Sequence, residues 1–249
     1  MNEIKKFKKE MQDRIQEYGV DDEFQKHSNE WLEESMRKKY VYNFSFLGRP
    51  IIQYPQDMIA MQELIWKVQP DLIIETGIAH GGSLILSASM LELNAACGGN
   101  SDARVLGVDI DIRSHNREAI EAHPMSKRID MIQGSSIDSE TIKKVYAYTE
   151  EKKNILVFLD SNHTHEHVLA ELEAYAPLVA VGSYCVVYDT FVEDVPDNVF
   201  PDRPWSPGNN PKTAVWKYLE KNTDFEIDKS MQNKLLITVA PDGYLKRMH

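Results

Sequence analysis

The chain has 249 residues, 42% of them hydrophobic and 27% charged, which is typical of one large α/β domain or of one domain with an appendage. Its net charge of −11 argues against nucleic acid or an anionic membrane surface as the main partner, because both carry charge of the same sign.

Two features bear on the compartment. Cys97 and Cys185 lack the spacing of a metal site, so we expect buried free thiols in a reducing environment. The lysine-rich Met1–Glu10 contains no apolar segment of the kind that a secretory signal needs, and no run approaches the length of a membrane span. These features predict a cytoplasmic protein.

The first part of the chain differs from the rest. Residues 1–39 carry apolar positions at spacings of three and four, which predict two amphipathic helices broken near Gly19–Asp22. We expect this extension to act as a lid or a dimerisation element of a homo-oligomer, outside a main domain formed by residues 40–249. The segment Tyr40–Pro55 indicates an irregular approach to the next helix, which Gln56-Asp57 would cap and which would run to Val68.

From Asp71 onwards, short apolar runs alternate with segments of helical composition near residues 83–93, 114–121, 138–149 and 166–175. This alternation predicts an α/β, Rossmann-like fold with a mostly parallel seven-stranded sheet and helices on both faces. The last two runs are joined only by Lys229–Lys234, so we expect an antiparallel hairpin at one edge. The expected strands are Leu72–Glu75, Val105–Asp109, Ile129–Gln133, Ile155–Asp160, Tyr184–Asp189, Phe225–Asp228 and Leu235–Ala240.

The first of these strands leads into a glycine turn and a helix. Its spacing, Glu75-x-Gly77-x-x-x-Gly81-Gly82-Ser83, is neither the Gly-x-Gly-x-x-Gly of dinucleotide folds nor a P-loop. The turn therefore suits a ligand without a pyrophosphate, held by N–H groups at the helix N-terminus. S-adenosylmethionine (SAM) fits, with Glu75 facing its sulfonium or amino group while loop amides and Ser83 take its carboxylate. Alternatively, the glycines only let the helix pack closely on the strand.

Acidic residues end four of the first five expected strands. In open α/β sheets ligands bind outside the carboxyl ends of the strands, where Glu75, Asp109, Asp160 and Asp189 would converge. Four converging acids are costly without a ligand or ion to balance them. Asp109 lies where nucleotide-binding folds place the acid that accepts from a ribose diol, although a helix N-cap, which Asp111 could also provide, is the alternative.

The segment Gly134–Asp138 follows the third strand and opens a helix. Ser136 or Asp138 could cap that helix, and this is the better-supported local interpretation. Contact between Ser136 and an adenine edge is the functional alternative, and both can hold.

Three histidines follow the fourth strand within five residues. His163 and His167 are four apart and could share a helix face, which is a spacing of metal ligands, whereas isolated histidines are more often surface or cap residues. His163 is the best candidate because it lies nearest to the strand end. The chain contains no His-Glu-x-x-His and no Gly-x-Ser-x-Gly, which disfavours a zinc protease and a serine hydrolase.

Asp160 and Asp189 end two strands that could be neighbours. Paired oxygen ligands at such a place suit Mg²⁺, and a metal-bound hydroxyl loses its proton more easily, which makes it a nucleophile toward a sulfonium methyl group. Alternatively, Asp160 acts as a general base or only holds the cofactor.

The stretch Thr190–Pro211 is long, aperiodic and rich in proline. Loops of this length in compact domains are functional lids or disordered segments, and Phe200 and Trp205 favour a lid. We expect Trp205 and Asn209, together with Tyr54 and His163, to contact an acceptor rich in hydroxyls.

These segments resemble the cephalosporin hydroxylase/rhamnosyl O-methyltransferase family over about Tyr40 to Ala240. The resemblance implies the class I SAM-dependent methyltransferase fold. It is carried by Glu-Thr-Gly-Ile-Ala-His-Gly-Gly-Ser (75–83), Gly-Val-Asp-Ile-Asp-Ile-Arg (107–113), Gln-Gly-Ser-Ser (133–136), Leu-Asp-Ser-Asn-His-Thr-His-Glu-His (159–167) and Asp-Arg-Pro-Trp (202–205).

Carried over by motif, the resemblance implies a role for each site residue. Asp160 would be the first metal ligand beside the cofactor. Similar proteins carry two adjacent acid or amide ligands at the end of the fifth strand, where this chain has Tyr188-Asp189. His163 would compensate for the missing ligand or act as a base without a metal. The cofactor would be held by Glu75, Gly77, His80, Gly81 and Ser83 at its methionine end, by Asp109 at the ribose and by Ser136 at the adenine.

Together these features predict a SAM-dependent O-methyltransferase acting on a sugar or another polyhydroxylated small molecule, with or without assistance from a divalent ion. Two alternatives are a cephalosporin-hydroxylase-like biosynthetic enzyme and a non-catalytic partner protein that keeps the fold. No facial triad for iron and no flavin motif is visible in the sequence.

Overall fold

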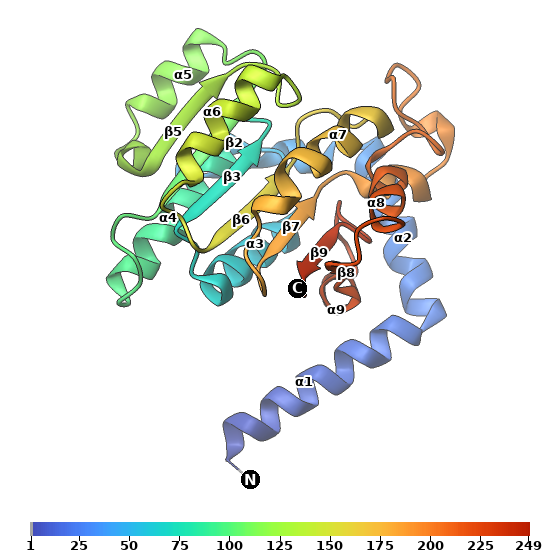
Figure 1. Ribbon diagram of the computed structural model, residues 1–249. Helices are drawn as coiled ribbons and strands as arrows, with labels where there is room; N and C mark the ends of the chain where they lie inside the picture. The colour runs from blue at the N-terminus through green and yellow to red at the C-terminus, as the bar shows by residue number, and fades with distance from the viewer. Residues whose placement is uncertain (1) are drawn as a thin grey trace.

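A seven-stranded sheet forms the centre of the molecule, as the computed structural model of residues 2–249 shows (Figure 1). Five strands are parallel, and the last two pair antiparallel at one edge. The predicted fold class is therefore confirmed. In sheet order the strands are β5 (Ile129–Gln133), β4 (Arg104–Asp109), β3 (Leu72–Thr76), β6 (Ile155–Leu159), β7 (Tyr184–Val187), β9 (Tyr244–Arg247) and β8 (Phe225–Ile227).

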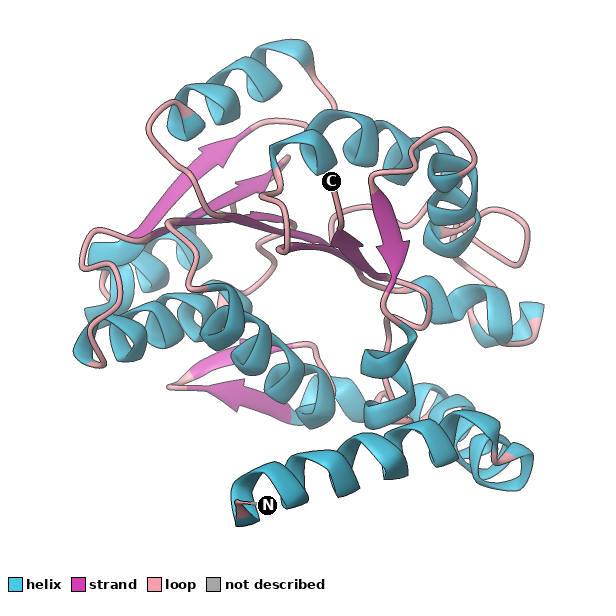
Figure 2. Cartoon of the chain, turned by 60° about the horizontal axis from the view of Figure 1, so that its bottom comes forward, coloured by secondary structure: helices cyan, strands magenta, loops and turns pink. Residues whose placement is uncertain are grey.

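Helices cover both faces of this sheet (Figure 2), so its central strands read as continuous apolar runs. Every residue of β3 and β6 is buried. Alternate strand residues contribute to two separate cores, one on each face. One core includes α3 (Pro55–Val68) and α4 (Gly82–Ala96), and the other includes α6 (Ser139–Thr149), α7 (His165–Tyr175) and α8 (Pro211–Leu219).

The order of the strands reverses at β3, which pairs with β4 on one side and β6 on the other. From β3 the chain continues through α4 to β4 and through α5 (Ser114–Glu121) to β5 on one side of β3. Strand β6, which leads into α7, lies on the other side. Such a switch point leaves a crevice outside the carboxyl ends of the strands, where ligands bind in open α/β sheets.

Two helices precede the sheet, as predicted, with a break at Asp21. They are α1 (Glu3–Val20) and α2 (Asp22–Arg37), and the side chain of Asp21 caps α2 by accepting from the N–H of Phe24. The helix α1 has no buried residue and runs along the lower side of the molecule beside α9 (Lys229–Leu235) (Figure 1). Residue 1 lies outside the described part of the chain.

The predicted strand Leu235–Ala240 is wrong, although the antiparallel edge is present. Residues 229–235 form α9, whose first turn is capped by the side chain of Asp228, and the last strand is β9. Residues 238–240 look like a strand in sequence, but they are held by the buried carboxylate of Asp57 instead. That carboxylate accepts from the hydroxyl of Thr238 and from the N–H of Val239 at 3.0 Å.

This use of Asp57 also overturns its predicted role as a helix cap. The cap position of α3 belongs to Tyr54, followed by Pro55 at the first turn, and Asp57 is fully buried. Burial raises the pKa of Asp57 to about 6, although its hydrogen bonds oppose the rise.

The segment expected to be irregular contains a hairpin. Strands β1 (Phe44–Phe46) and β2 (Arg49–Ile51) pair antiparallel across Leu47-Gly48, both of which have positive φ, as a two-residue hairpin turn requires. The prediction of two buried thiols is half right, since Cys185 is buried and Cys97 is exposed. Among the described residues, no helix is both long and apolar enough to cross a bilayer.

Candidate functional site

A cavity of about 900 Å³ lies in the crevice at the carboxyl ends of the strands. Its inner wall is formed by the turn after β3 and by residues that follow β6 and β7. Its outer wall comes from residues 36–53 and from the predicted lid, including residues 199–203 and Trp205. This volume lies in the upper part of the range of ligand pockets.

The turn after β3 needs glycine for two separate reasons. Gly77 has φ +89°, and a Cβ placed there would lie 2.0 Å from the carbonyl oxygen of Asp160. The loops that follow β3 and β6 therefore touch at this point, which brings the glycine turn and Asp160 into one cavity. Gly81 also has a positive φ, +81°, and it precedes the first turn of α4.

The carboxylate of Asp109 fixes this turn from the neighbouring strand. One oxygen accepts from the N–H of Ile78 at 2.8 Å and of Ala79 at 3.3 Å, and the other accepts from the N–H of Asp111. A helix-capping role for Asp111 is wrong, since α5 starts after Arg113 without a side-chain cap. Asp109 thus shapes the turn directly, and the ribose contact stays a prediction.

Two residues that sequence reasoning missed hold the turn from outside. The guanidinium of Arg49 donates to the carbonyl oxygen of His80 at 2.9 and 2.6 Å, and it also reaches the side chain of Asn116. Asn116 in turn donates to the carbonyl oxygen of Ala79 at 2.9 Å. Arg49 belongs to β2, and the Leu47-Gly48 turn that follows the alternating Phe44-Ser45-Phe46 was the signal that could have revealed the hairpin.

Glu75 lies under the turn with its carboxylate almost out of reach of solvent. The hydroxyl of Ser83 donates to one of its oxygens, whereas the other is buried without a hydrogen-bond partner. Burial raises the pKa of Glu75 to about 7, although the hydroxyls of Ser83 and of nearby Ser87 oppose the rise. A buried carboxylate oxygen without a donor is a place where a cationic group of a ligand would be stabilised.

Ser136 follows the carboxyl end of β5, the edge strand beside β4, and is buried. Its hydroxyl is 3.0 Å from Nε2 of His167, which also lies 3.2 Å from the hydroxyl of Ser161. The cap of α6 is Asp138, so the local alternative for that residue is confirmed. Contact of Ser136 with adenine stays a prediction, because its side chain faces His167 rather than the cavity.

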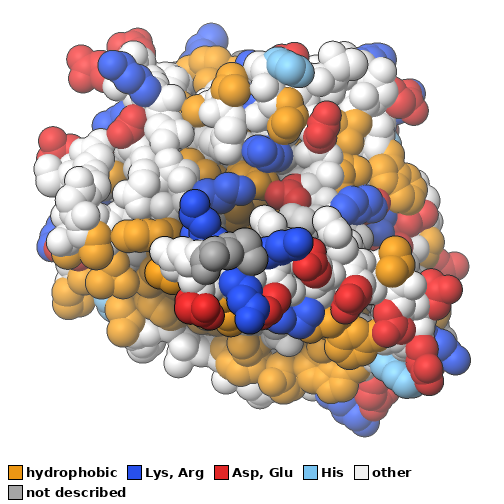
Figure 3. Space-filling view, turned by 90° about the horizontal axis from the view of Figure 1, so that it is seen from below, with side chains coloured by type: hydrophobic (Ala, Val, Ile, Leu, Met, Phe, Trp, Pro, Cys, Tyr) orange, Lys and Arg blue, Asp and Glu red, His pale blue; other side chains and the backbone are white. Residues whose placement is uncertain are grey.

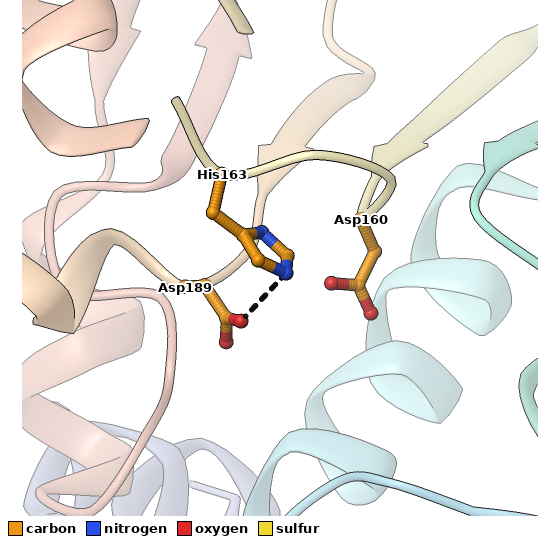
Figure 4. A group of neighbouring side chains, drawn as sticks. All are labelled: Asp160, His163 and Asp189. Atoms are coloured by element: carbon orange, nitrogen blue, oxygen red, sulfur yellow. Dashed lines mark ion pairs between the residues drawn. The ribbon is translucent and has the colours of Figure 1, made fainter. Parts of the chain in front are cut away.

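The strongest cluster joins three side chains from the ends of β6 and β7 (Figure 4). Asp160, His163 and Asp189 each offer a ligand atom within 4.8 Å of the others, and Nε2 of His163 lies 3.1 Å from Oδ2 of Asp189. The predicted face shared by His163 and His167 is wrong, since α7 begins at His165 and leaves His163 in the preceding loop. That loop lets the imidazole turn toward Asp189.

Negative charge accumulates around Asp160. Its pKa is raised well above the usual range, first because the carboxyl is surrounded by protein and then because Asp189 and Glu75 lie nearby. In the part of the chain that the structure describes, neither Asp160 nor Asp189 pairs with a lysine or an arginine. Gln53 donates to Oδ2 of Asp160 at 3.2 Å, and the oxygen of the same amide is buried without a partner. Two carboxylates, an amide and an imidazole are a donor set that fits a hard divalent cation.

The residue before Asp189 cannot take part in this set. Tyr188 is 3% exposed, and its ring packs against Phe158 in the core at a centroid distance of 6.1 Å. Its neighbour Asp189 adopts the left-handed conformation with φ +56°, which is uncommon for a residue other than glycine. The chain therefore turns sharply after β7, so that Asp189 faces the cavity and Tyr188 the core.

The predicted lid is folded against this cluster. The ring of Trp205 meets that of His163 edge to face, with centroids 4.7 Å apart, and the guanidinium of Arg203 lies 5.2 Å from the Trp205 ring centre. The lid is held by its own acids, as Glu193 accepts from the N–H of Gly208. Trp205 thus lines the cavity as predicted for an acceptor contact.

Two predicted acceptor contacts do not reach the cavity. Tyr54 is fully buried, and its hydroxyl bonds to Ser35 of α2 at 2.5 Å. Burial raises the pKa of Tyr54 to about 12, although the bond to Ser35 opposes the rise. Asn209 accepts from the N–H of His165 and donates to the carbonyl oxygen of Pro204, so it ties the lid to α7. Both residues have structural roles, and the predicted contacts with the acceptor are wrong.

Relatives of known name share most of this chain. Residues 38–248 match the family described as Rhamnosyl O-methyltransferase/CmcI. The rhamnosyl O-methyltransferase of Mycobacterium tuberculosis is 31% identical over 208 residues, which cover 82% of this chain and 78% of that protein. The protein of the same name from Mycobacterium leprae is 29% identical over 226 residues, covering 87% of this chain and 90% of that protein.

Solved structures share the fold at lower identity. A CmcI structure with Mg and SAM aligns with a TM-score of 0.56 and 19% identity over 84% of this chain and 78% of that one. The O-methyltransferase of Bacillus cereus in complex with SAH aligns with a TM-score of 0.52 and 15% identity, covering 80% and 81%. MycE, in complex with Mg, SAH and mycinamycin VI, gives a TM-score of 0.51 and 19% identity, covering 88% of this chain and 54% of that one.

Proposed function

The chain belongs to the rhamnosyl O-methyltransferase/CmcI family and is a SAM-dependent O-methyltransferase, and we propose that its acceptor is a hydroxyl of a sugar or another polyhydroxylated small molecule. The observation that carries the proposal is the position of the Asp160–His163–Asp189 cluster beside the glycine turn, in one cavity. The matching relatives are named for the methylation of a rhamnosyl group, which supports a glycosidic acceptor.

We propose that the turn after β3 holds the methionine end of SAM. The buried free oxygen of Glu75 would meet its amino or sulfonium group, and the N–H groups at the start of α4, with Ser83, would take its carboxylate. His80 and Gly81 would contribute through the backbone of the turn. Asp109 would bind the ribose from the neighbouring strand, and Ser136 would lie beside the adenine.

When bound, SAM supplies a sulfonium methyl group that an acceptor oxygen attacks in line, so that the C–S bond breaks and S-adenosylhomocysteine (SAH) leaves. The protein orients the acceptor hydroxyl and removes its proton. Asp160 and His163 are the two candidate bases. His163 is held for this task by Asp189, since a carboxylate oxygen 3.1 Å from Nε2 fixes the orientation of the imidazole.

A divalent cation such as Mg²⁺ would fit the carboxylate oxygens of Asp160 and Asp189. Gln53 and His163 lie beside them and would offer further donor atoms. Such an ion lowers the pKa of a hydroxyl that it binds. The uncompensated charge at Asp160 supports this role, because a buried carboxyl next to another carboxyl is costly without a cation. If no ion binds, His163 remains as the base, with Asp189 as its partner.

Calorimetric titration with SAH, with and without Mg²⁺, tests the proposal first. We expect micromolar binding, and a further heat of Mg²⁺ binding that is absent in Asp160→Asn but kept in the control Glu140→Gln, an exposed acid on α6. Formation of SAH from SAM is then measured with methyl α-rhamnoside as acceptor. Absence of SAH binding in both conditions would contradict the cofactor site.

Within the extension of residues 1–39, α1 would form a dimer interface of a homo-oligomer, whereas α2 packs on the methyltransferase domain of residues 40–249 and its end lines the cavity. On α1, Ile4 and Phe7 are 64% and 61% exposed. Residues 5–9 contain four lysines, whereas residues 10–17 contain three acids and one arginine. Figure 3 shows several basic side chains on this side of the molecule. Two copies of α1 packed antiparallel would bring each basic half against an acidic half.

Light scattering on the eluting protein measures this state. The wild-type chain should elute at twice the mass of one chain, and Phe7→Glu should elute at half of that. Val181→Glu, a change at another exposed apolar residue away from α1, should keep the wild-type mass. A monomeric wild type would contradict the dimer.

A cytoplasmic location stays part of the proposal, supported by the two free cysteines.

A further inference from the structure

Charge is divided within the cavity in a way that the proposed reaction does not explain. Its floor carries the acids Asp160 and Asp189, whereas its walls carry four permanent cations and one further acid, Asp202. The protein as a whole has a net charge of −11, so this concentration of cations departs from the rest of the chain. The four cations are Arg37, Lys39, Arg113 and Arg203.

Lys39 and Arg203 are the least compensated of the four. Among residues 2–249, no carboxylate lies within ion-pair distance of either one, and the guanidinium of Arg203 lies over the ring of Trp205. Lys39 follows α2 in a left-handed conformation, φ +56°, which places it on the cavity wall rather than in a further helical turn. Arg37 is partly neutralised by Glu33 at 2.8 Å.

Two acids of the lid hold the lid in place. Glu193 accepts from Gly208 and Asn210, and Asp194 pairs with Lys212 on α8 at 2.5 Å. The lid therefore presents Arg203 to the cavity with Asp202 as the lid acid beside it. Arg203 and Trp205 together offer a guanidinium beside an aromatic face, next to His163.

We propose that the acceptor carries an anionic group, a phosphate ester or a carboxylate, which Arg203 and Lys39 bind while its hydroxyl lies at His163 and Asp160. This inference rests on the proposed function. If the floor acids hold a divalent cation, Arg37 and Arg113 still have Glu33 and Asp111 within ion-pair distance. Lys39 and Arg203 have no such partner in the described part of the chain, and a neutral sugar would leave them without one. Arginine and lysine are the residues that proteins use for phosphate and carboxylate groups.

The same walls also predict an apolar part of the acceptor. Between the cations lie Met36, Val41, Phe191, Val199 and Phe200, all on the lid and α2 side of the cavity. A phenyl glycoside with an acidic group therefore combines the three features: a sugar hydroxyl, an anion and an apolar group.

The test compares matched probes on the full chain loaded with SAH and Mg²⁺. Calorimetry measures the dissociation constants of phenyl β-D-glucuronide and phenyl β-D-glucoside, which differ only at C6, where the first carries a carboxylate and the second a hydroxymethyl group, and of phenyl phosphate as the phosphate source. The variants are Arg203→Gln, Lys39→Gln and their double variant, with Lys221→Gln, an exposed lysine at the end of α8, as control.

We expect the glucuronide or phenyl phosphate to bind at least tenfold more tightly than the glucoside, and the tighter of the two names the anionic group. The double variant should reduce this preference to threefold or less, with SAH affinity unchanged within twofold, and Lys221→Gln should keep the full preference. Equal affinities for all three probes, or no binding of any probe, in a protein that still binds SAH would overturn the inference. Failure to bind SAH would instead overturn the proposed function.

Discussion

The two halves of the cavity are built in different ways. The half assigned to the cofactor is made of strand ends and of a turn whose N–H and carbonyl groups are fixed by Asp109, Arg49 and Asn116. The half assigned to the acceptor is made of side chains from α2, the β1–β2 hairpin and the lid, which are far apart in the sequence. The first is a rigid backbone cradle and the second a surface of side chains.

This difference separates what is shared with relatives from what selects the acceptor. A backbone cradle tolerates changes of side chain, and it suits a cofactor that is the same for every member of a fold. A wall of side chains such as Arg203 and Trp205 can be changed one residue at a time without disturbing the sheet. Variants on the cofactor side should therefore weaken SAH binding, and variants on the acceptor side should weaken binding of the acceptor. Variants of the Asp160–His163–Asp189 cluster, where the two halves meet, should impair the reaction of both substrates.

The largest effect is expected where the halves meet. Asp160→Asn should lower turnover by about 10³-fold or more, since it removes both a candidate base and a candidate metal ligand. SAH formation measures this loss. An Asn variant with turnover within tenfold of the wild type would exclude both roles of Asp160.

The same variant should be more stable than the wild type without metal at pH 7. The folded state raises the pKa of Asp160, so it binds more protons than the unfolded state, and the ionised carboxyl costs stability once the pH exceeds the unfolded value. Asparagine removes that cost. Urea unfolding at pH 7 and at pH 4 measures it, and the gain should shrink at pH 4, where the unfolded carboxyl is itself half protonated.

On the cofactor side, Asp109→Ala should raise the dissociation constant of SAH by about tenfold or more. The variant leaves the N–H groups of Ile78 and Ala79 without their acceptor, and each charge-assisted hydrogen bond contributes about 1.5–3 kcal/mol. Calorimetry with SAH measures the change. Asp109→Asn keeps an acceptor for the turn and should lose less, whereas unchanged affinity in Asp109→Ala would contradict both roles.

The pH dependence of SAH affinity tests whether the carboxyl of Glu75 contributes to the cofactor half of the cavity. With a pKa of about 7, the empty protein holds this carboxyl largely protonated at pH 6 and largely ionised at pH 8. If the amino group of SAH binds only the ionised form, its affinity should rise about tenfold from pH 6 to pH 8. Glu75→Gln should bind weakly at both values, without this rise, and Asp160→Asn should keep the rise. A flat profile in the wild-type protein would remove Glu75 from the cofactor site.

The sequence predicted the sheet and the turn after β3 well because their signals are contiguous. Glu75 to Ser83 form one motif, and the rule that parallel strands end on the same side brings Asp109, Asp160 and Asp189 to it. The structure confirms the sheet, joins Asp109 to the turn and brings Asp160 and Asp189 into one cluster. No long-range packing needs to be known for that step.

The acceptor half depends on packing that a local pattern does not contain. Tyr54 was expected at the cavity, yet α2 covers it and Ser35 bonds its hydroxyl. Gln53, one residue earlier, was missed although it bonds to Asp160. Likewise, residues 238–240 have the composition of a strand, but the buried carboxylate of Asp57 on α3 binds them instead. In each case a contact between distant segments decides the outcome.

The smallest effect is expected on the acceptor side, at Trp205. Its ring contacts His163 edge to face and lines the cavity, and such aromatic contacts contribute about 0.5–1.5 kcal/mol. Trp205→Ala should therefore raise the KM for the acceptor by about two- to tenfold, with SAH affinity unchanged. Trp205→Phe keeps an aromatic face and should lie closer to the wild type. If kcat falls more than KM rises, Trp205 acts mainly by positioning the imidazole of His163. A change in SAH affinity would show instead that the two halves of the cavity are coupled, contrary to their separate construction.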